Sequence, residues 1–244
     1  MSTPFDLREF TYAHDGLALK GQLAVPDGPG PHPAVLVMHS ALGLGELVCQ
    51  RALDLAAMGY VALATDMYGL GRREPDFEAH TAQHHALQAD HPRLRARVAA
   101  SFEAVRALPD VDPRRIGAIG YCFGGQCVLE LARSGAQVAA VVSFHGLLKT
   151  QAPARAGATG AKILAITGAH DPYAPAEDVD AFQKEMAAAG ADWQLTVYGQ
   201  GWHSFTDPEI DAKFDIPGVR YDRVLDRLSW DQAVAFLDAA LGGG

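Results

Sequence analysis

The chain has 244 residues, 49% of them hydrophobic, which is enough to bury a substantial core, and we expect one α/β domain over residues 1–244. Its formal net charge of −9, with no long run of Lys or Arg, excludes the broad basic surface that binds nucleic acid. No secretory leader and no membrane-length hydrophobic stretch are found, so we expect a cytoplasmic protein without a membrane partner.

Hydrophobic runs alternate with segments of helical periodicity along most of the chain. The predicted strands are 34–38, 61–66, 116–120, 138–144, 162–168 and 193–199. The predicted helices are 46–57, 93–107, 123–133, 176–189 and 229–241. This alternation predicts a mainly parallel sheet with helices on both faces, and periodicity alone is also compatible with a Rossmann-like or flavodoxin-like sheet.

Two segments lie outside this alternation. Residues 7–26 alternate weakly between hydrophobic and polar and break at His14-Asp15-Gly16, which predicts an antiparallel hairpin leading into the sheet. Residues 69–91 are polar, and we interpret them as a surface excursion beside the functional site.

One cysteine has a sequence context that favours chemistry. Cys122 is the centre of Gly120-Tyr121-Cys122-Phe123-Gly124, directly after a predicted strand and directly before a predicted helix. That context is typical of a nucleophile elbow, a sharp turn that projects a reactive side chain. The positive end of the helix favours a thiolate at Cys122, and the N–H of Phe123 is placed to bind an oxyanion.

A small buried thiol is the alternative interpretation of Cys122, because most free cysteines are buried. Cys49 and Cys127 lack such an elbow, and we expect both in the core. A redox role for Cys122 is a further alternative, but it requires Cys127 as the resolving thiol. With three cysteines and no Cys-x-x-Cys pair, neither a disulfide framework nor a thiolate zinc site is expected.

Two loops supply the partners that a nucleophile needs, a base and a group that orients the base. Asp171 and His203 each follow a predicted strand, at the carboxyl edge where open parallel sheets build their sites. The chain order Cys122, Asp171, His203 is therefore nucleophile, acid and base. His170 competes with Asp171, but a histidine there would leave the base without a carboxylate.

The motif Gly-Tyr-Cys-Phe-Gly-Gly, followed by Asp171 and then by Trp-His-Ser-Phe around His203, closely resembles the dienelactone hydrolases, also called carboxymethylenebutenolidases. The resemblance extends over nearly the whole chain. It implies an α/β-hydrolase fold with Cys122, His203 and Asp171 as the catalytic triad. It also implies that the backbone N–H of Ala41 is the second oxyanion donor, beside that of Phe123.

The same resemblance shows departures in the substrate region. The family carries a glutamate after the first central strand, where this chain has Ser40, and it binds a substrate carboxylate with two arginines. The first arginine aligns with Arg72 or Arg73. The second falls on Asp207, whose carboxylate would repel an anionic substrate.

Further candidates for the pocket come from the surrounding loops. An aromatic wall, with core packing as the alternative, is expected from Tyr68, Tyr173, Trp202 and Phe205. Arg220 and Arg227 can replace the missing positive charge only if the C-terminal segment folds back onto the site. His39 and His145 also end predicted strands, and local hydrogen bonding is the favoured interpretation of both.

These residues predict a hydrolase that cleaves a lactone or an activated ester through a Cys122 thiolate and a thioester. Two alternatives stay open: a broad aryl ester or thioester hydrolase without the carboxylate clamp, and a non-catalytic binding protein of the same fold. A small-molecule ester or lactone is the expected partner, and no metal or organic cofactor is expected. Nothing in the sequence predicts an oligomeric state.

Overall fold

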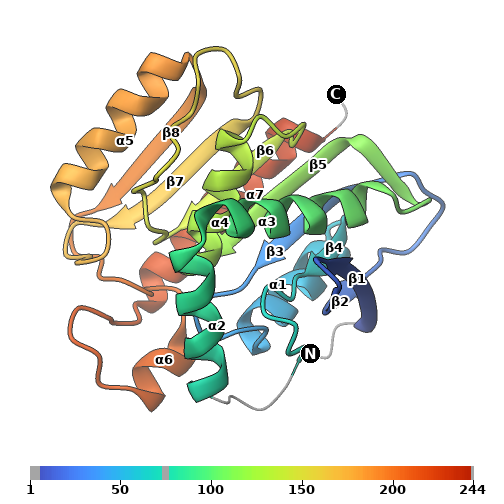
Figure 1. Ribbon diagram of the computed structural model, residues 1–244, viewed down its shortest axis with the longest axis horizontal. Helices are drawn as coiled ribbons and strands as arrows, with labels where there is room; N and C mark the ends of the chain where they lie inside the picture. The colour runs from blue at the N-terminus through green and yellow to red at the C-terminus, as the bar shows by residue number, and fades with distance from the viewer. Residues whose placement is uncertain (1–5, 73–76, 243–244) are drawn as a thin grey trace.

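The computed structural model describes residues 6–72 and 77–242, which form an eight-stranded sheet with helices on both faces (Figure 1). The strands are β1 (Arg8–His14), β2 (Leu17–Ala24), β3 (His32–Met38), β4 (Val61–Ala64), β5 (Val111–Tyr121), β6 (Ala140–Phe144), β7 (Lys162–Gly168) and β8 (Asp192–Tyr198). The helices are α1 (Glu46–Ala57), α2 (Phe77–Ala89), α3 (His91–Arg106), α4 (Phe123–Arg133), α5 (Ala176–Ala189), α6 (Pro208–Lys213) and α7 (Arg223–Leu241).

The strands follow the order β1-β2-β4-β3-β5-β6-β7-β8 across the sheet. The hairpin of β1 and β2 turns through Asp15-Gly16, and β2 pairs antiparallel with β4. From β4 to β8 every neighbouring pair of strands is parallel. The predicted hairpin and the predicted mainly parallel sheet are confirmed, and the parallel pairing brings the loops after β3, β5, β7 and β8 to one edge.

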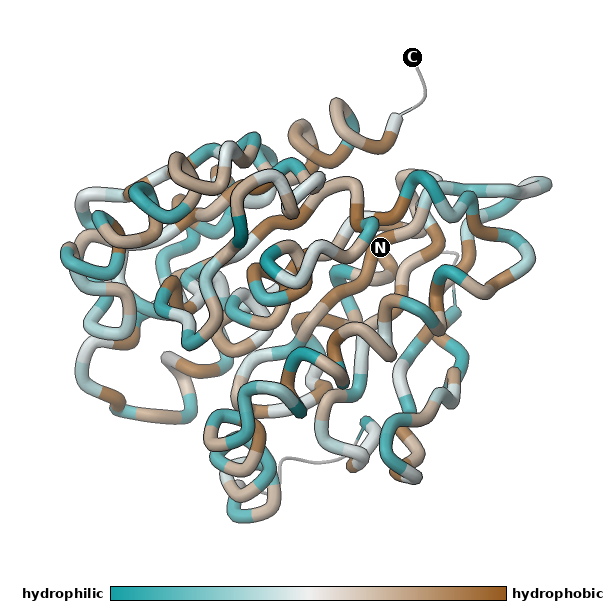
Figure 2. Tube along the Cα trace, turned by 45° about the horizontal axis from the view of Figure 1, so that its top comes forward, coloured by the Kyte–Doolittle hydropathy of each residue, from teal (hydrophilic) through white to brown (hydrophobic). Residues whose placement is uncertain are grey.

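Each face of the sheet has its own hydrophobic layer. Alternate residues of a strand face opposite layers: Leu36 and Met38 pack with α2 to α5, whereas Val35 and Val37 pack with α1 and α7. Hydrophobic segments accordingly run through the centre of the molecule, between helices that carry both hydrophobic and hydrophilic residues (Figure 2). Burial on both faces explains why the central strands read as continuous hydrophobic runs.

The segment predicted as a polar surface excursion contains a helix, α2, which the sequence did not predict. The less exposed positions include His80, His84, Leu87 and Gln88, which share one side of a helix. Gln88 donates a hydrogen bond to Gln126 on α4 (2.6 Å). The helical period was hidden because this inner face consists mainly of histidine and glutamine rather than aliphatic residues.

The C-terminal helix α7 starts at Arg223, earlier than the predicted start at Ser229. Asp222 caps it, because its carboxylate accepts hydrogen bonds from the N–H groups of Val224 (2.9 Å) and Leu225 (3.1 Å). α7 has 19 residues. Within the described residues, no helix, α7 included, is both long enough and hydrophobic enough to cross a membrane.

A fully buried carboxylate fixes the position of α4. Glu130 accepts hydrogen bonds from Arg95 on α3 (2.6 Å) and from Arg133 on its own helix (3.0 Å). Arg133 also donates to Glu185 on α5 (2.8 Å). Because a buried charge is stable only with such partners, the network joins three helices and holds the one whose first turn presents Cys122.

Candidate active site

Four loops at the carboxyl edge of the sheet carry the residues that were predicted to act together. Ala41 lies after β3, Cys122 after β5, Asp171 after β7 and His203 after β8. Cys122 and His203 are 81 positions apart in the chain and are brought into contact by the parallel arrangement of these strands.

The turn between β5 and α4 explains how Cys122 is presented. Its backbone has φ 54° and ψ −113°, a strained conformation for a residue with a side chain. The Cys122 N–H donates to the carbonyl of Phe144 (3.0 Å), and the Cys122 carbonyl accepts from the N–H of Gln126 (3.2 Å). A Cβ at Gly120 would collide with the carbonyl of Gly124, so this tight elbow requires glycine there.

His203 connects the thiol to a buried carboxylate. Its Nε2 lies 3.1 Å from Sγ of Cys122, and its Nδ1 lies 2.9 Å from Oδ2 of Asp171. The other carboxylate oxygen of Asp171 accepts a hydrogen bond from the N–H of Tyr173 (2.8 Å). Of the two adjacent candidates, Asp171 is therefore the one in contact with His203, whereas His170 is exposed.

The backbone of His203 is held by the chain segment that precedes α7. The His203 N–H donates to the carbonyl of Gly218 (3.1 Å), and the His203 carbonyl accepts from the N–H of Arg220 (3.0 Å). These bonds form an isolated parallel bridge between His203 and Val219. The segment of Arg220 therefore does fold back onto the site, although the Arg220 side chain itself is exposed.

The charges of Cys122 and His203 depend on each other. Burial disfavours the thiolate, but the charge and hydrogen bond of His203 and the N–H groups of Ala41 and Phe123 hold the pKa of Cys122 below its ordinary value. Burial also disfavours the imidazolium, but the charge on Cys122 and the hydrogen bond to Asp171 raise the pKa of His203 to about 10. Together the two shifts favour a thiolate–imidazolium pair over the neutral thiol and imidazole.

The peptide groups expected to bind an oxyanion lie beside the thiol. The N–H groups of Ala41 and Phe123 both interact with Sγ, and Phe123 is the first residue of α4. The loop that carries Ala41 is held from behind. The Ala41 carbonyl accepts a hydrogen bond from the hydroxyl of Tyr68 (3.2 Å), and the Ser40 carbonyl accepts one from Nδ1 of His39 (2.7 Å).

The aromatic residues expected to form a wall divide into two pairs. Tyr173 is 45% exposed, and its ring centroid lies 4.6 Å from that of His203. Trp202 is partly exposed on the adjacent loop. Tyr68 and Phe205 are only 2% and 0% exposed, so their placement does not support substrate contact.

Tyr68 and Phe205 instead support the loops of the site from inside. The ring of Tyr68 lies 5.9 Å from that of Phe123, next to the oxyanion loop. The ring of Phe205 lies 5.1 Å from that of His145 and 5.7 Å from that of Tyr198, beneath the loop of His203. Both therefore adopt the core-packing alternative.

The arginine candidates do not converge on the thiol. Arg72 is exposed, and its guanidinium donates to the carboxylate of Glu46 (2.6 Å). Arg73 lies outside the described residues. Arg227 is exposed on α7, where it pairs with Asp231 (3.7 Å).

Asp207 has a structural role at the start of α6. Its carboxylate accepts hydrogen bonds from the N–H groups of Glu209 (3.0 Å) and Ile210 (3.3 Å), and burial raises its pKa above the ordinary value. This helix was not predicted, although Asp207 followed by Pro208 is a typical helix start. The position that aligns with a substrate-binding arginine therefore serves as a helix cap in this chain.

His39 and His145 make the local hydrogen bonds that were favoured for them. Besides its bond to Ser40, His39 accepts from the N–H of Met67 through Nε2 (3.1 Å), and Nε2 of His145 lies 2.8 Å from the hydroxyl of Thr206. Burial lowers the pKa of both rings. Within residues 6–72 and 77–242, no group of three or more His, Cys, Asp or Glu side chains is arranged to hold a metal ion.

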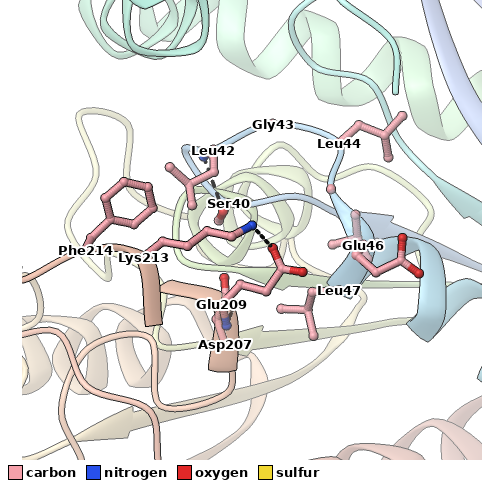
Figure 3. Close-up of a pocket in the computed structure, with 12 residues that line it drawn as sticks. Ser40, Leu42, Gly43, Leu44, Glu46, Leu47, Asp207, Glu209, Lys213 and Phe214 are labelled. Atoms are coloured by element: carbon pink, nitrogen blue, oxygen red, sulfur yellow. Dashed lines mark hydrogen bonds and ion pairs between the residues drawn. The ribbon is translucent and has the colours of Figure 1, made fainter. Parts of the chain in front are cut away.

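A pocket of about 70 Å³, which no motif of the sequence indicates, lies beside the oxyanion loop (Figure 3). Its lining comes from the loop after β3, the start of α1 and the region of α6, and includes Ser40, Leu42, Leu44, Glu46, Leu47, Asp207, Glu209, Lys213 and Phe214. These segments are far apart in the chain. The pocket therefore depends on tertiary packing, and no local sequence motif could have predicted it.

A mainly parallel sheet whose strand-end loops carry an elbow cysteine, an acid and a histidine in that chain order has the architecture of the α/β-hydrolases. A sequence model of the dienelactone hydrolase family matches residues 19–241. The chain belongs to the dienelactone hydrolase family, a family of hydrolases.

Solved structures and curated relatives agree with this assignment. The structure named m3DLH is 37% identical, with a TM-score of 0.90 and coverage of 98% of this chain and 99% of that one. A dienelactone hydrolase-like promiscuous phosphotriesterase from metagenomic libraries is 33% identical, with the same TM-score of 0.90 and the same coverage of 98% and 99%. A probable 2-oxo-3-(5-oxofuran-2-ylidene)propanoate lactonase of Bradyrhizobium is 28% identical over 225 residues, which cover 88% of this chain and 87% of the relative.

Proposed function

We propose that the protein hydrolyses lactones and activated carboxylic esters with Cys122 as the nucleophile. The observation that carries this proposal is the 3.1 Å contact between Sγ of Cys122 and Nε2 of His203, which continues through the 2.9 Å contact between His203 and Asp171. Membership of the dienelactone hydrolase family and the lactonase name of the Bradyrhizobium relative support the substrate class.

In the first half of the reaction, the Cys122 thiolate attacks the carbonyl carbon of the substrate. The carbonyl oxygen becomes an oxyanion and takes over the N–H groups of Ala41 and Phe123 that interact with the resting thiolate. The His203 imidazolium donates its Nε2 proton to the departing oxygen as the C–O bond breaks. A thioester on Cys122 remains, and Asp171 keeps the histidine ring in the required orientation.

In the second half, His203 has to act as a base. Burial lowers its pKa, and the charge on Cys122 is the largest of the effects that oppose burial and raise the pKa to about 10. A thioester carries no such charge, so the pKa of His203 falls after acylation and the neutral ring can take a proton from water. The water attacks the thioester, the acid product leaves, and the thiolate–imidazolium pair is restored.

Sulfur chemistry limits the substrates of this mechanism. A thiolate leaves a tetrahedral intermediate more readily than an alkoxide does, so the intermediate returns to substrate unless the departing oxygen is also a good leaving group. Enol lactones, aryl esters and thioesters meet this requirement. Amides and simple alkyl esters are expected to react poorly.

Hydrolysis of p-nitrophenyl acetate by matched variants tests the role of Cys122. Replacing the nucleophile in Cys122→Ala should reduce kcat/KM by at least about 10³-fold. Cys127→Ala removes a buried thiol from the same helix and should keep most of the rate. If Cys122→Ala retains most of the wild-type rate while Cys127→Ala behaves like wild type, the nucleophile assignment is wrong.

Hydrolysis of neutral phosphotriesters is a second candidate function. It is favoured by the similarity to the promiscuous phosphotriesterase, which is 33% identical over nearly the whole chain. The same thiolate would attack phosphorus, form an S–P bond and expel an aryl oxide, and water activated by neutral His203 would then cleave the S–P bond and release the dialkyl phosphate; only triesters with good leaving groups should react. Release of p-nitrophenol from diethyl p-nitrophenyl phosphate, compared between wild type and Cys122→Ala, decides whether the site supports this reaction.

A further inference from the structure

The pocket shown in Figure 3 is lined in part by the oxyanion loop. Ser40 and Leu42, which line it, are the residues on either side of Ala41. The Ala41 N–H is a proposed oxyanion donor. A substrate carbonyl bound there therefore lies between two residues that line this pocket, and one of its two substituents can extend into it.

Of the two substituents of the substrate carbonyl, the leaving group is not the one that this pocket can hold. It has to stay within about 3 Å of the His203 ring, because the imidazolium protonates the departing oxygen. Of the described residues, neither His203 nor the exposed Tyr173 next to it lines the pocket. The acyl side of the substrate has no such constraint, so it is the side that can extend toward the pocket.

The walls of the pocket are largely hydrophobic. Leu42 on the oxyanion loop, Leu47 in the first turn of α1 and Phe214 after α6 come from three separate segments. An engineered cavity of about 150 Å³ holds benzene, so a volume of about 70 Å³ fits a short acyl chain better than a fatty one.

The charged groups of the pocket disfavour an anion. Glu46, Asp207 and Glu209 contribute carboxylates. The nearby cations are already paired, since Lys213 donates to Glu209 (2.8 Å) and Arg72 donates to Glu46 (2.6 Å). Glu46 and Glu209 are more than half exposed, whereas Asp207 is buried, so a carboxylate brought in by a substrate would meet its strongest repulsion at Asp207.

We propose that this pocket is an acyl-binding subsite that selects short, uncharged acyl groups and rejects acyl groups ending in a carboxylate. The inference rests on the proposed function, because it assigns one side of the same substrate. Acyl chain length and acyl charge are tested separately, with p-nitrophenyl esters so that the leaving group stays constant.

Leu47 tests the size of the subsite. The Leu47→Phe variant should lower kcat/KM for p-nitrophenyl valerate relative to p-nitrophenyl acetate by about 10-fold, because the larger ring fills the pocket. Leu47→Ala should shift the preference in the opposite direction. Leu53→Phe makes the same change on α1 outside the pocket and should leave the ratio as in wild type. Wild-type ratios in both Leu47 variants would overturn the proposal.

Glu209 tests the charge of the subsite. The wild type should prefer p-nitrophenyl valerate over mono-p-nitrophenyl glutarate, whose acyl chain has the same length but ends in a carboxylate, by at least about 10-fold. Glu209→Arg should reduce this preference by at least about 5-fold. Glu103→Arg makes the same charge change at an exposed ion pair on α3 and should not alter it. Equal wild-type rates for the two esters would contradict the proposal.

The two proposals fail in different ways. If Cys122→Ala hydrolyses p-nitrophenyl acetate at the wild-type rate, the proposed function is wrong. If Cys122→Ala is inactive but the ester preferences are the same in wild type, Leu47→Phe and Glu209→Arg, hydrolysis stands and the subsite is wrong.

Discussion

Cys122 and Cys127 belong to the same helix, one as its cap and one inside it, yet their thiols lie in opposite electrostatic environments. Burial, Glu130 and Cys122 raise the pKa of Cys127 well above the ordinary thiol value. At Cys122 the effect of burial is outweighed by His203 and by two backbone N–H groups, so the pKa falls. The difference comes from position at the helix end, where N–H groups lack helical partners.

This contrast predicts selective alkylation of the native protein. Iodoacetamide at neutral pH should modify Cys122 at least about 100-fold faster than Cys127, because only the thiolate reacts. Cys49 should also stay unmodified, since burial raises its pKa to about 11. Peptide mass spectrometry gives the site, and loss of esterase activity should follow the Cys122 adduct. Equal labelling of Cys127 and Cys122 would contradict the assigned environments.

The pH dependence of kcat/KM should have two limbs. The reaction requires the Cys122 thiolate, so activity is lost as pH falls through a thiol pKa below the ordinary 9.0. It also requires the His203 imidazolium, so activity is lost again as pH rises through about 10. Initial rates with p-nitrophenyl acetate, corrected for spontaneous hydrolysis, should show a plateau between the limbs. A rate that continues to rise beyond pH 10 would exclude the ion pair as the active form.

Asp171→Asn should change both the rate and this profile. The substitution removes the negative charge that helps to raise the pKa of His203 and replaces one carboxylate oxygen with an amide NH2 group, which donates instead of accepting. The alkaline limb should therefore move to lower pH, and kcat should fall by about 10³- to 10⁴-fold. A purely structural effect would lower the rate without moving the limb, so the full profile has to be measured.

Glu130→Gln should be strongly destabilising. The substitution leaves Arg95 and Arg133 without the charge that both contact in a buried site, which is expected to cost about 3 kcal/mol in the free energy of unfolding. Glu103→Gln removes one partner of an exposed pair on α3 and should cost no more than about 0.5 kcal/mol. Denaturant unfolding of both variants gives the comparison, and similar losses would refute the assigned role of the buried network.

Asp207 should behave as a helix cap in stability measurements. Asp207→Ala removes both side-chain hydrogen bonds at the start of α6 and should destabilise the protein by about 1 kcal/mol. Asp207→Asn keeps a capping oxygen and should stay close to wild type. If the two variants lose the same stability, the carboxylate charge rather than the cap is the important property.

The central strands and the elbow could be predicted because each has a local cause. Strands buried on both faces form continuous hydrophobic runs, and a turn as tight as that around Cys122 restricts the residues at Gly120 and Gly124. The proximity of Asp171 and His203 followed from chain order, because parallel strands end at the same edge of a sheet.

Other features could not be predicted because their causes are tertiary. Tyr68 and Phe205 are aromatic residues on site loops, and sequence alone does not show whether such a ring lines a pocket or supports it from behind. The inner face of α2 is polar because His84 packs against Phe123 (5.0 Å between ring centroids) and Gln88 bonds to Gln126. The pocket of Figure 3 exists only because α6 lies opposite the start of α1.

The excursion that contains α6 starts and ends at the proposed base. The N–H of Asp207 donates to the carbonyl of Ser204 (3.0 Å), and the N–H of Arg220 donates to the carbonyl of His203 (3.0 Å). Loop-closure entropy grows slowly with loop length, so residues between these anchors can be exchanged, shortened or extended at small cost. The two ends of the excursion thus hold the histidine, whereas the residues between them form one wall of the neighbouring pocket, so the base can stay in place while the pocket wall diversifies.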